Sequence, residues 1–187
     1  MIGPRAKLVG LAALFAAPIV ASFVTYFFLR PTTPPTANYG ELLLPPGTIT
    51  AQPFTNAEGA SFAFTGLAGQ WILVVSDSGE CPADCAGKLT TLRQVRLALG
   101  RDASRVARVF VIDDLRRPAA GLLAAFEGTV LAVTPTGMSL PPGAGNDRAH
   151  IYLVDPHGNV MMRWPAGADG KRMLGDLKRL LKASQIG

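Results

Sequence analysis

Two cysteines are the residues of this chain best suited to chemistry. Cys81 and Cys85 are its only cysteines, and they follow the apolar run Trp71-Ile-Leu-Val-Val75 and a short polar loop. This order predicts a buried strand, a loop, and both thiols at the start of a helix, where backbone N–H groups stabilise thiolates. Thiolates exchange disulfides and bind soft metals such as Cu(I). The two residues are also close enough along the chain to form a disulfide, which would be reversible in a redox site or purely structural otherwise.

An apolar segment near the N-terminus indicates the compartment of these thiols. The 22 residues from Leu8 to Leu29 carry no charge, which at 1.5 Å per residue is long enough to cross a hydrocarbon core of about 30 Å. The segment ends in aromatic residues rather than a small-residue cleavage site, so we expect an uncleaved anchor. Arg5 and Lys7 precede the span, and Arg30 follows it. The positive-inside rule predicts a single-pass protein of the bacterial inner membrane, with residues 1–7 in the cytoplasm, residues 8–29 as the transmembrane anchor and the chain after it in the periplasm.

The net charge of +5 says little about partners, because three basic residues flank the anchor. Without them, the exported part has 15 basic and 13 acidic residues and a net charge of +2. This near balance gives no reason to expect a nucleic acid partner.

Proline spacing divides the exported part into a tether and one domain. Residues 30–53 contain Pro-Thr-Thr-Pro-Pro and Leu-Pro-Pro-Gly, which are typical of a semi-extended tether. Residues 54–187 are close to the common size of a single domain.

Hydrophobic spacing within this domain predicts alternating strands and helices. The expected strands are a hairpin over Phe54 to Phe64, then Ile72 to Val75, Val106 to Ile112, His150 to Val154 and Asn159 to Trp164. The expected helices are one after Cys85 with Leu89, Leu92, Val95 and Leu99 on one face, one from Ala119 to Phe126, and a last one capped by Asp169. The order β-β, β-α, β-α, β-β-α predicts an α/β, thioredoxin-like fold with an N-terminal β-hairpin, preceded by one transmembrane helix.

With these elements in place, the exported domain resembles the Sco/SenC family of membrane-tethered, thioredoxin-like copper proteins, which assist cytochrome c oxidase assembly. Four stretches carry the resemblance: Phe54-Thr with Gly59, Phe62 and Gly69-Gln-Trp71; Cys81-Pro-Ala-Asp-Cys85; Arg108-Val-Phe-Val-Ile-Asp113; and Ile151-Tyr-Leu-Val-Asp-Pro156 with Gly158. The chain is a divergent member, since Ala86 rather than proline follows the second cysteine.

The resemblance implies a copper site for Cu(I) or Cu(II), made of both motif cysteines and one histidine. Cys81 and Cys85 match the motif. The family places its histidine about five residues before the tyrosine of the Tyr-Leu pair, where this chain has Asp147. We take His150 as the candidate third ligand, because it opens the strand expected to abut the thiol loop. The alternative is a strand-edge histidine with no ligand role, and His157 is interpreted as a turn residue.

Asp113 and Asp114 end a strand on the same side as the thiol loop. They could position a partner or tune the thiols, but capping and turn roles are the more ordinary explanation.

Three functions remain open at this point. The first is a copper-binding assembly factor, which is no turnover enzyme in the ordinary sense. Its partner would be a cytochrome c oxidase subunit that carries a copper site, or another copper or thiol protein. The second is a periplasmic thiol–disulfide reductase without bound metal, although thioredoxin-type oxidoreductases use Cys-x-x-Cys rather than Cys-x-x-x-Cys. The third is a metal-free structural assembly partner. In the first two, Cys81 and Cys85 are the redox thiols.

Overall fold

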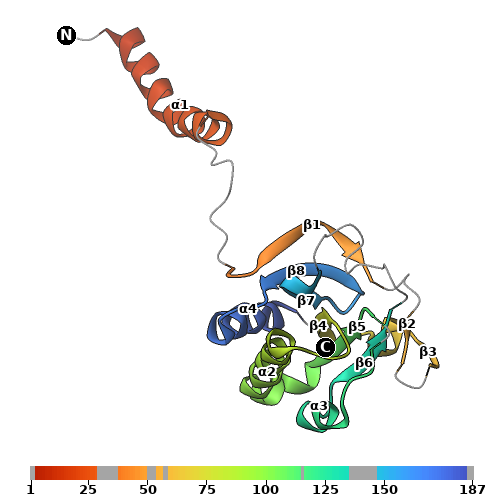
Figure 1. The fold of residues 1–187 in the computed structure, drawn as a ribbon. Coiled ribbons are helices and arrows are strands. Elements are labelled where there is room, and N and C mark those ends of the chain that lie inside the picture. The colour runs from red at the N-terminus through yellow and green to blue at the C-terminus, as the bar shows by residue number, and fades with distance from the viewer. Residues whose placement is uncertain are drawn as a thin grey trace. The chain divides into compact units, whose positions relative to one another are not determined.

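The computed structural model describes residues 3–28, 38–49, 54–56, 59–114, 116–134 and 147–184, which belong to two compact units, Met1–Ala37 and Asn38–Gly187. The first unit is helix α1 (Pro4–Phe28), labelled in Figure 1. This helix is long and apolar enough to cross a membrane, and none of its residues is buried in the protein. The structure thus has the predicted apolar helix near the N-terminus, and Leu29, the last residue of the predicted span, lies outside the described residues.

The second unit is built on one mixed sheet, which has eight strands in the part of the chain that the structure describes (Figure 1). The strands are β1 (Glu41–Thr48), β2 (Phe54–Thr55), β3 (Ser61–Phe62), β4 (Trp71–Asp77), β5 (Val106–Ile112), β6 (Val130–Val133), β7 (His150–Val154) and β8 (Asn159–Pro165). Their order across the sheet is β1-β8-β7-β4-β5-β6-β2-β3. Strands β4, β5 and β6 run parallel, whereas β7 pairs antiparallel with both β4 and β8. Every residue of the central strand β4 is buried, which explains its continuous apolar sequence.

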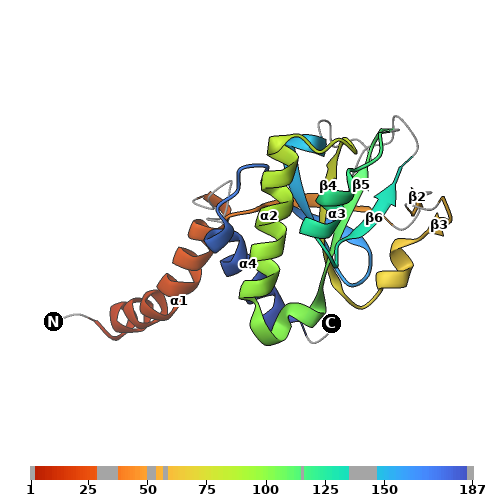
Figure 2. The ribbon, with the colours of Figure 1, turned by 60° about the horizontal axis from the view of Figure 1, so that its bottom comes forward.

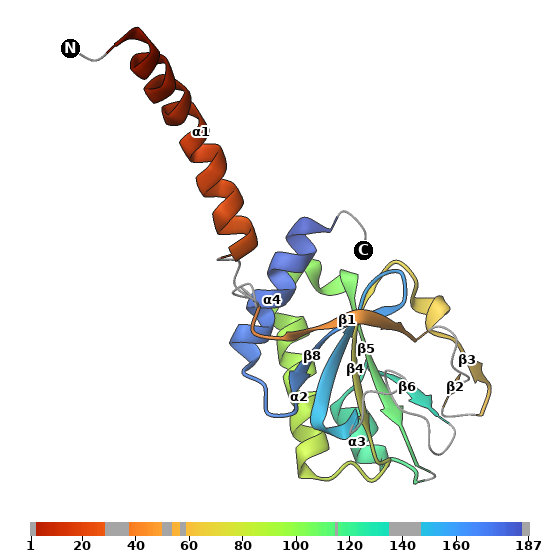
Figure 3. The ribbon, with the colours of Figure 1, turned by 90° about the horizontal axis from the view of Figure 1, so that it is seen from above.

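Helices cover one face of this sheet. Helices α2 (Ala83–Ala98) and α4 (Gly170–Ala183) lie side by side on it, and the short α3 (Ala120–Ala125) lies beside β5 and β6 (Figures 2 and 3). The apolar residues of α2 and α4 form one buried cluster with Ile151 and Leu153 of β7. Tyr152 and Val154 alternate with them and belong to a second cluster on the opposite face, together with Phe54 and Phe64.

Most of the predicted elements appear with nearly the expected bounds. The hairpin pairs Phe54 with Phe62, and β5 and β7 begin and end at the predicted residues. The side chain of Asp169 caps α4 by accepting the N–H groups of Lys171 and Arg172. Strand β6 was not predicted.

Part of the predicted tether belongs to the domain instead. The compact unit begins at Asn38, and β1 pairs antiparallel with β8, with Glu41 opposite Arg163. The sequence conceals this strand because Pro45 and Pro46 lie inside it, and the register shifts between Leu42 and Gly47. Strand β1 is the edge of the sheet, the place where a strand tolerates proline. The rest of the predicted tether, residues 30–37 and 50–53, lies outside the described residues.

A buried carboxylate fixes the entry into β1. Asp176 on α4 accepts the backbone N–H groups of Tyr39 and Gly40 at 3.1 and 2.8 Å, and the indole N–H of Trp164 at 3.0 Å. A side chain at residue 40 would collide with Trp164 and Met162. This close approach requires glycine there and attaches the start of β1 to the helical layer.

Candidate redox and metal site

Cys81 and Cys85 form a disulfide at the start of α2, with their Cα atoms 5.1 Å apart. The loop before the helix turns tightly, because the N–H of Cys81 donates to the carbonyl of Ser78 at 3.0 Å. Cys81 has a φ of 45°, a left-handed conformation that is uncommon for a residue other than glycine. Cys85 is fully buried, whereas 8% of Cys81 is exposed. The predicted disulfide is therefore present, its reversibility stays a prediction, and Cys81 is the less buried of the two cysteines.

A neighbouring loop holds the disulfide loop in place. Asp114, which follows β5, accepts the N–H groups of Gly79 at 3.0 Å and of Arg116 at 3.1 Å. Burial raises the pKa of the Asp114 carboxyl, but hydrogen bonds from Ser78, Gly79 and Arg116 outweigh it and leave the pKa below its ordinary value. The carboxylate is therefore the form that clamps the loop.

A buried ion pair lies beneath the loop. The ammonium of Lys88 is 2.7 Å from the carboxylate of Asp77, and both side chains are almost completely buried. Lys88 Nζ also donates to the carbonyl oxygens of Arg148, at 2.7 Å, and of Ser76, at 3.3 Å. Burial of two charges is costly unless they are paired and hydrogen bonded, and both conditions hold here. Lys88 is one helical turn after Cys85, so that a buried cation and a buried sulfur share one face of α2.

Arg148 extends this pair toward the start of β7. Its Nε donates to Asp113 Oδ2 at 2.9 Å and lies 3.9 Å from Asp77 Oδ1. The hydrogen bond with Asp113 raises the pKa of Arg148 above its ordinary value. Asp77, Lys88, Asp113 and Arg148, referred to below as the ion network, therefore connect β4, α2, the end of β5 and the segment before β7.

Sequence reasoning did not identify the ion network. It assigned Asp113 a capping or turn role, and it gave no role to Asp77, Lys88 or Arg148. One signal was available, because Lys88 lies between Cys85 and Leu92 on what is otherwise the apolar face of α2. A charge at a core position of a helix indicates a buried partner.

His150 opens β7 as predicted, but its side chain lies on the other face of the sheet from the cysteines. Its ring is 5.9 Å from that of Tyr152, centroid to centroid. Tyr152 faces away from α2, whereas Ile151 packs in the cluster that contains Cys81 and Cys85. In this disulfide form the three predicted ligands therefore do not converge, and the role of His150 as a ligand stays a prediction.

Nor do other side chains supply a site. The ranges that the structure describes contain no group of three or more His, Cys, Asp or Glu side chains placed to hold a metal ion. His157 is exposed in the turn after β7, where its N–H donates to Asp155 Oδ1 at 2.9 Å, as expected for a turn residue. The side chain of Asp147 lies outside the described residues.

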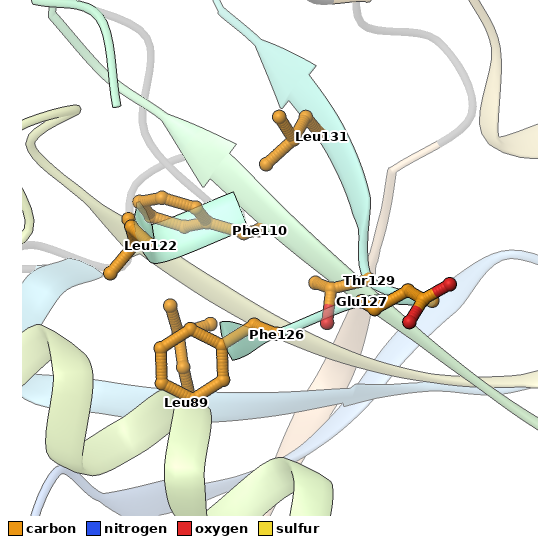
Figure 4. A pocket seen from close by; sticks show the side chains of 8 residues that line it. Leu89, Phe110, Leu122, Phe126, Glu127, Thr129 and Leu131 are labelled. Atoms are coloured by element: carbon orange, nitrogen blue, oxygen red, sulfur yellow. The ribbon is translucent and has the colours of Figure 1, made fainter. Parts of the chain in front are cut away.

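An apolar cavity of about 260 Å³ lies between α2, α3, β5 and β6 (Figure 4). Its apolar lining is made of Leu89, Phe110, Leu122, Phe126 and Leu131. None of the predicted site residues borders it. The cavity is therefore separate from the thiol chemistry.

Arg108 is buried close to this cavity, where its Nη2 donates to the carbonyl of Glu127 at 2.7 Å. Its Nε and Nη1 have no hydrogen-bond partner among the residues described. Burial lowers the pKa of Arg108, and the nearby cations Arg96 and Arg93 lower it further.

A disulfide at the start of a helix that follows the central strand of such a sheet defines a thioredoxin-like thiol protein. A family model described as "Transmembrane-like, thioredoxin-like, C-terminal domain" matches residues 71–184. The chain belongs to this family. No curated protein sequence matches it.

Solved Sco structures have the same fold. Yeast Sco1 with copper bound matches with a TM-score of 0.60 and 17% identity, over 74% of this chain and 92% of that one. Apo Sco1 from Thermus thermophilus matches with a TM-score of 0.61 and 20% identity, over 77% and 97%. BsSco, a member of the Sco family of cytochrome c oxidase assembly proteins with a disulfide switch, matches with a TM-score of 0.58 and 14% identity, over 77% and 98%. The resemblance to the Sco/SenC family is thus confirmed at the level of the fold.

Proposed function

We propose that the protein is a membrane-anchored thiol protein that assists assembly of the copper site of cytochrome c oxidase, with Cys81 and Cys85 as its redox pair. The observation that carries the proposal is the asymmetric disulfide, in which Cys85 is completely buried and Cys81 keeps 8% of its surface exposed. When one cysteine is less buried than the other, a partner can react with the less buried one while the other resolves the product. The Sco fold supports the assembly role.

The chemistry is a two-electron exchange. In the reduced protein, the Cys81 thiolate attacks a disulfide of the partner and forms a mixed disulfide, as one partner sulfur leaves. The Cys85 thiolate then attacks the Cys81 sulfur, and the second partner sulfur leaves. The partner gains two electrons and, with protons from the two protein thiols, becomes a dithiol. The protein is left as the disulfide in the structure. Two equivalents of a small external thiol must reduce it again before the next round, and they leave as their own disulfide.

The test uses the full-length, reduced protein in detergent micelles. It is mixed with an oxidised peptide that contains the two cysteines of an oxidase copper site, and the peptide thiols are counted. We expect the wild type to reduce the peptide, Cys81→Ser to be inactive, and Cys85→Ser to accumulate the mixed disulfide. The control His157→Ala should behave as wild type. If the wild type leaves the peptide oxidised while its own thiols remain free, the reductase mechanism is wrong.

Copper binding is the second candidate function. It is favoured by two adjacent soft ligands and by relatives of the same fold with copper bound. In this form Cys81, Cys85 and His150 would hold Cu(I) or Cu(II) for transfer to the oxidase subunit. The test is the copper stoichiometry of the reduced, anaerobic protein with each of the three residues replaced in turn. A protein that neither exchanges disulfides nor binds copper would be the structural assembly partner.

A further inference from the structure

We infer that the exposed side of helix α4 docks on the anionic headgroups of the phospholipid leaflet beside which the domain is anchored. Such docking is a property of the domain in addition to the proposed thiol chemistry and does not depend on it. Three features of the chain carry the inference. They are the charges of α4, the attachment of the first residues of the domain to this helix, and the short length of chain between that attachment and the membrane span.

One side of α4 carries only positive charge. Its exposed basic residues, referred to below as the basic side of α4, are Lys171, Arg172, Lys178, Arg179 and Lys182. At 3.6 residues per turn, these positions share about a third of the helix circumference. The opposite side is buried and contains Met173, Leu177 and Leu181. Asp176, the single carboxylate in the sequence of α4, is buried too, so it does not offset the charge of the exposed side.

The helix gains little from these cations. Lys171 and Arg172 lie in the first turn, which has no acidic residue, and the helix macrodipole disfavours positive charge there. Lys178 and Lys182 are four residues apart, a spacing at which like charges repel. Within the described ranges, Arg179 alone of the five lies within ion-pair distance of a carboxylate, 3.7 Å from Asp176. The basic side therefore fits a negatively charged partner better than a role in stabilising the helix.

The chain enters the domain next to this basic side. Asp176 holds the backbone N–H groups of Tyr39 and Gly40, and the hydroxyl of Tyr39 accepts the N–H of Asp169 at 3.2 Å. The guanidinium of Arg172 lies over the ring of Tyr39, 3.9 Å from its centroid. The first residues of the domain are thus fixed to α4 and in contact with one of its five exposed cations.

The membrane span ends only a short way before this point. Helix α1 ends at Phe28, and ten residues separate it from Tyr39. Even a fully extended chain of this length spans at most about 40 Å. If α1 spans the membrane, Tyr39 and the cation that it contacts cannot move farther than this from the leaflet. A tether this short gives an effective concentration in the millimolar range, so that even a weak attraction to lipid is enough for docking.

The chemistry of the basic side suits anionic lipid. Each Lys or Arg near an anionic surface strengthens binding by about fivefold, and the attraction falls off within a Debye length of about 8 Å. Five cations on one side of a rigid helix can come within this distance together. The exported part as a whole has a net charge of only +2, so the attraction must come from a local surface of this kind.

The test measures how close α4 comes to lipid in the full-length protein. The disulfide form, in which Cys81 and Cys85 do not react with a thiol label, is placed in nanodiscs of phosphatidylcholine with or without anionic phosphatidylglycerol. A fluorescent donor is attached at Gly175→Cys, between the cations of the basic side, and the acceptor is attached to lipid headgroups. A β-carbon added at residue 175 meets no atom within 4 Å, so the label is accommodated.

A second label position and two charge variants are the controls. Gly66→Cys, also free of contacts, lies in the short helix η1 (Phe64–Leu67), whose Phe64 packs on the opposite face of the sheet from α4. The variant Lys171→Gln/Lys178→Gln/Lys182→Gln removes three charges from the basic side. Its matched control, Arg93→Gln/Arg116→Gln/Arg117→Gln, removes three exposed charges elsewhere in the domain and has the same net charge. Glutamine favours a helix about as well as lysine, so α4 should stay folded.

With the label at residue 175, we expect energy transfer to be about twofold higher on anionic than on neutral nanodiscs at about 50 mM salt, and equal on both at about 500 mM salt. With the label at residue 66, transfer should not rise on anionic lipid. The triple lysine variant should lose the gain, whereas the triple arginine variant should keep it.

Three results would overturn the inference. The first is equal transfer from residue 175 on both kinds of nanodisc, and the second is a gain that the triple lysine variant retains. The third is a gain that both triple variants lose, since net charge and not α4 would then be the cause. If the lysine variant keeps its distance to lipid but loses binding to an acidic partner protein, the basic side binds protein, and the lipid inference is also wrong.

Docking and thiol exchange are judged separately. The five cations do not include a residue of the disulfide loop, so the triple lysine variant should reduce the oxidised peptide as the wild type does. A protein that docks as expected but leaves the peptide oxidised would refute the exchange reaction alone.

Discussion

Gly79 packs directly against the backbone of Arg116: a β-carbon added at residue 79 would lie 1.8 Å from the carbonyl oxygen of residue 116. Gly79→Ala must therefore push apart the disulfide loop and the loop after β5. We expect it to lower the free energy of unfolding by about 1–3 kcal/mol, as other overpacked sites do. Both tryptophans, Trp71 and Trp164, lie in the domain, so tryptophan fluorescence during denaturation follows the domain within the full-length protein.

The control for this prediction is Gly87→Ala. A β-carbon at residue 87, inside α2, meets no atom within 4 Å. Because alanine favours a helix over glycine, the control should gain about 0.5–1 kcal/mol. Equal stability of the two variants would show that the contact between residues 79 and 116 does not constrain the loop.

Removing one charge of the buried ion pair between Lys88 and Asp77 should strongly destabilise the domain. Lys88→Met leaves Asp77 buried, and among the described residues the one remaining cation within ion-pair distance is Arg148, at 3.9 Å. The expected loss of unfolding free energy is about 3–5 kcal/mol, the usual result of breaking a buried pair. Asp77→Asn/Lys88→Met leaves no charge uncompensated and should lose less than the single variant. If the double variant is the less stable of the two, lost packing and not charge is the cause.

Removing the charge of Arg108 should not destabilise the domain, in contrast to removing the charge of Lys88. It is buried with one hydrogen bond, and no ion pair with a carboxylate is found for it in the described part of the chain. Its lowered pKa means that the fold disfavours the charged form, a cost that is present at every pH at which the group stays protonated. Arg108→Met should therefore leave the melting temperature unchanged or raise it. A loss as large as that of Lys88→Met would contradict this account.

Acid should weaken the clamp on the disulfide loop. Because the pKa of Asp114 is lower in the folded protein, its carboxylate contributes stability above the unfolded pKa of about 3.9. This contribution is lost as the pH falls through the folded pKa, that is, below about pH 4. Unfolding measured from pH 6 to pH 2.5 should show Asp114→Asn to be less stable at pH 6 and its difference from the wild type to shrink in acid. A difference that does not depend on pH would mean that the charge is not involved.

The orientation of the anchor can be tested by fusions. The uncharged helix α1 follows Arg5 and Lys7, so we expect the domain in the periplasm. Alkaline phosphatase fused after Gly187 should be active, and a fluorescent protein that folds only in the cytoplasm should stay dark. The reverse pattern would refute the topology and remove the oxidising compartment in which the disulfide is expected to form.

The sequence predicted the fold well because its signals are local. The three- and four-residue spacing of apolar residues along α2, the Asp169 cap and the continuous apolar run of β4 each indicate an element without knowledge of its neighbours. Strand β6 has four residues, too few to show the alternation of apolar and polar residues that indicates a strand. Strand β1 contains two prolines and depends for its place on Asp176, more than a hundred residues away.

The site was less predictable for a geometric reason. Strand β7 is buried on both faces after His150, so its residues are apolar in succession and alternation cannot tell which face meets α2. The sequence therefore placed His150 near the thiol loop but could not assign its face. The ion network forms because the fold brings residues 77, 88 and 148 together. No local sequence pattern predicts that these three residues are neighbours.

The left-handed backbone at Cys81 links the oxidation state of the pair to local order. This conformation is unfavourable by about 1–2 kcal/mol for a residue with a side chain, and Cys81 adopts it while bonded to Cys85. After reduction that covalent constraint is gone, and residue 81 is free to relax to an extended conformation. The amide hydrogens of the loop from Ser78 to Cys81 should then exchange with solvent faster in the dithiol form than in the disulfide form. A partner protein would thus contact an ordered loop in the disulfide form and a flexible loop in the dithiol form. The two oxidation states would then differ in binding before any sulfur reacts.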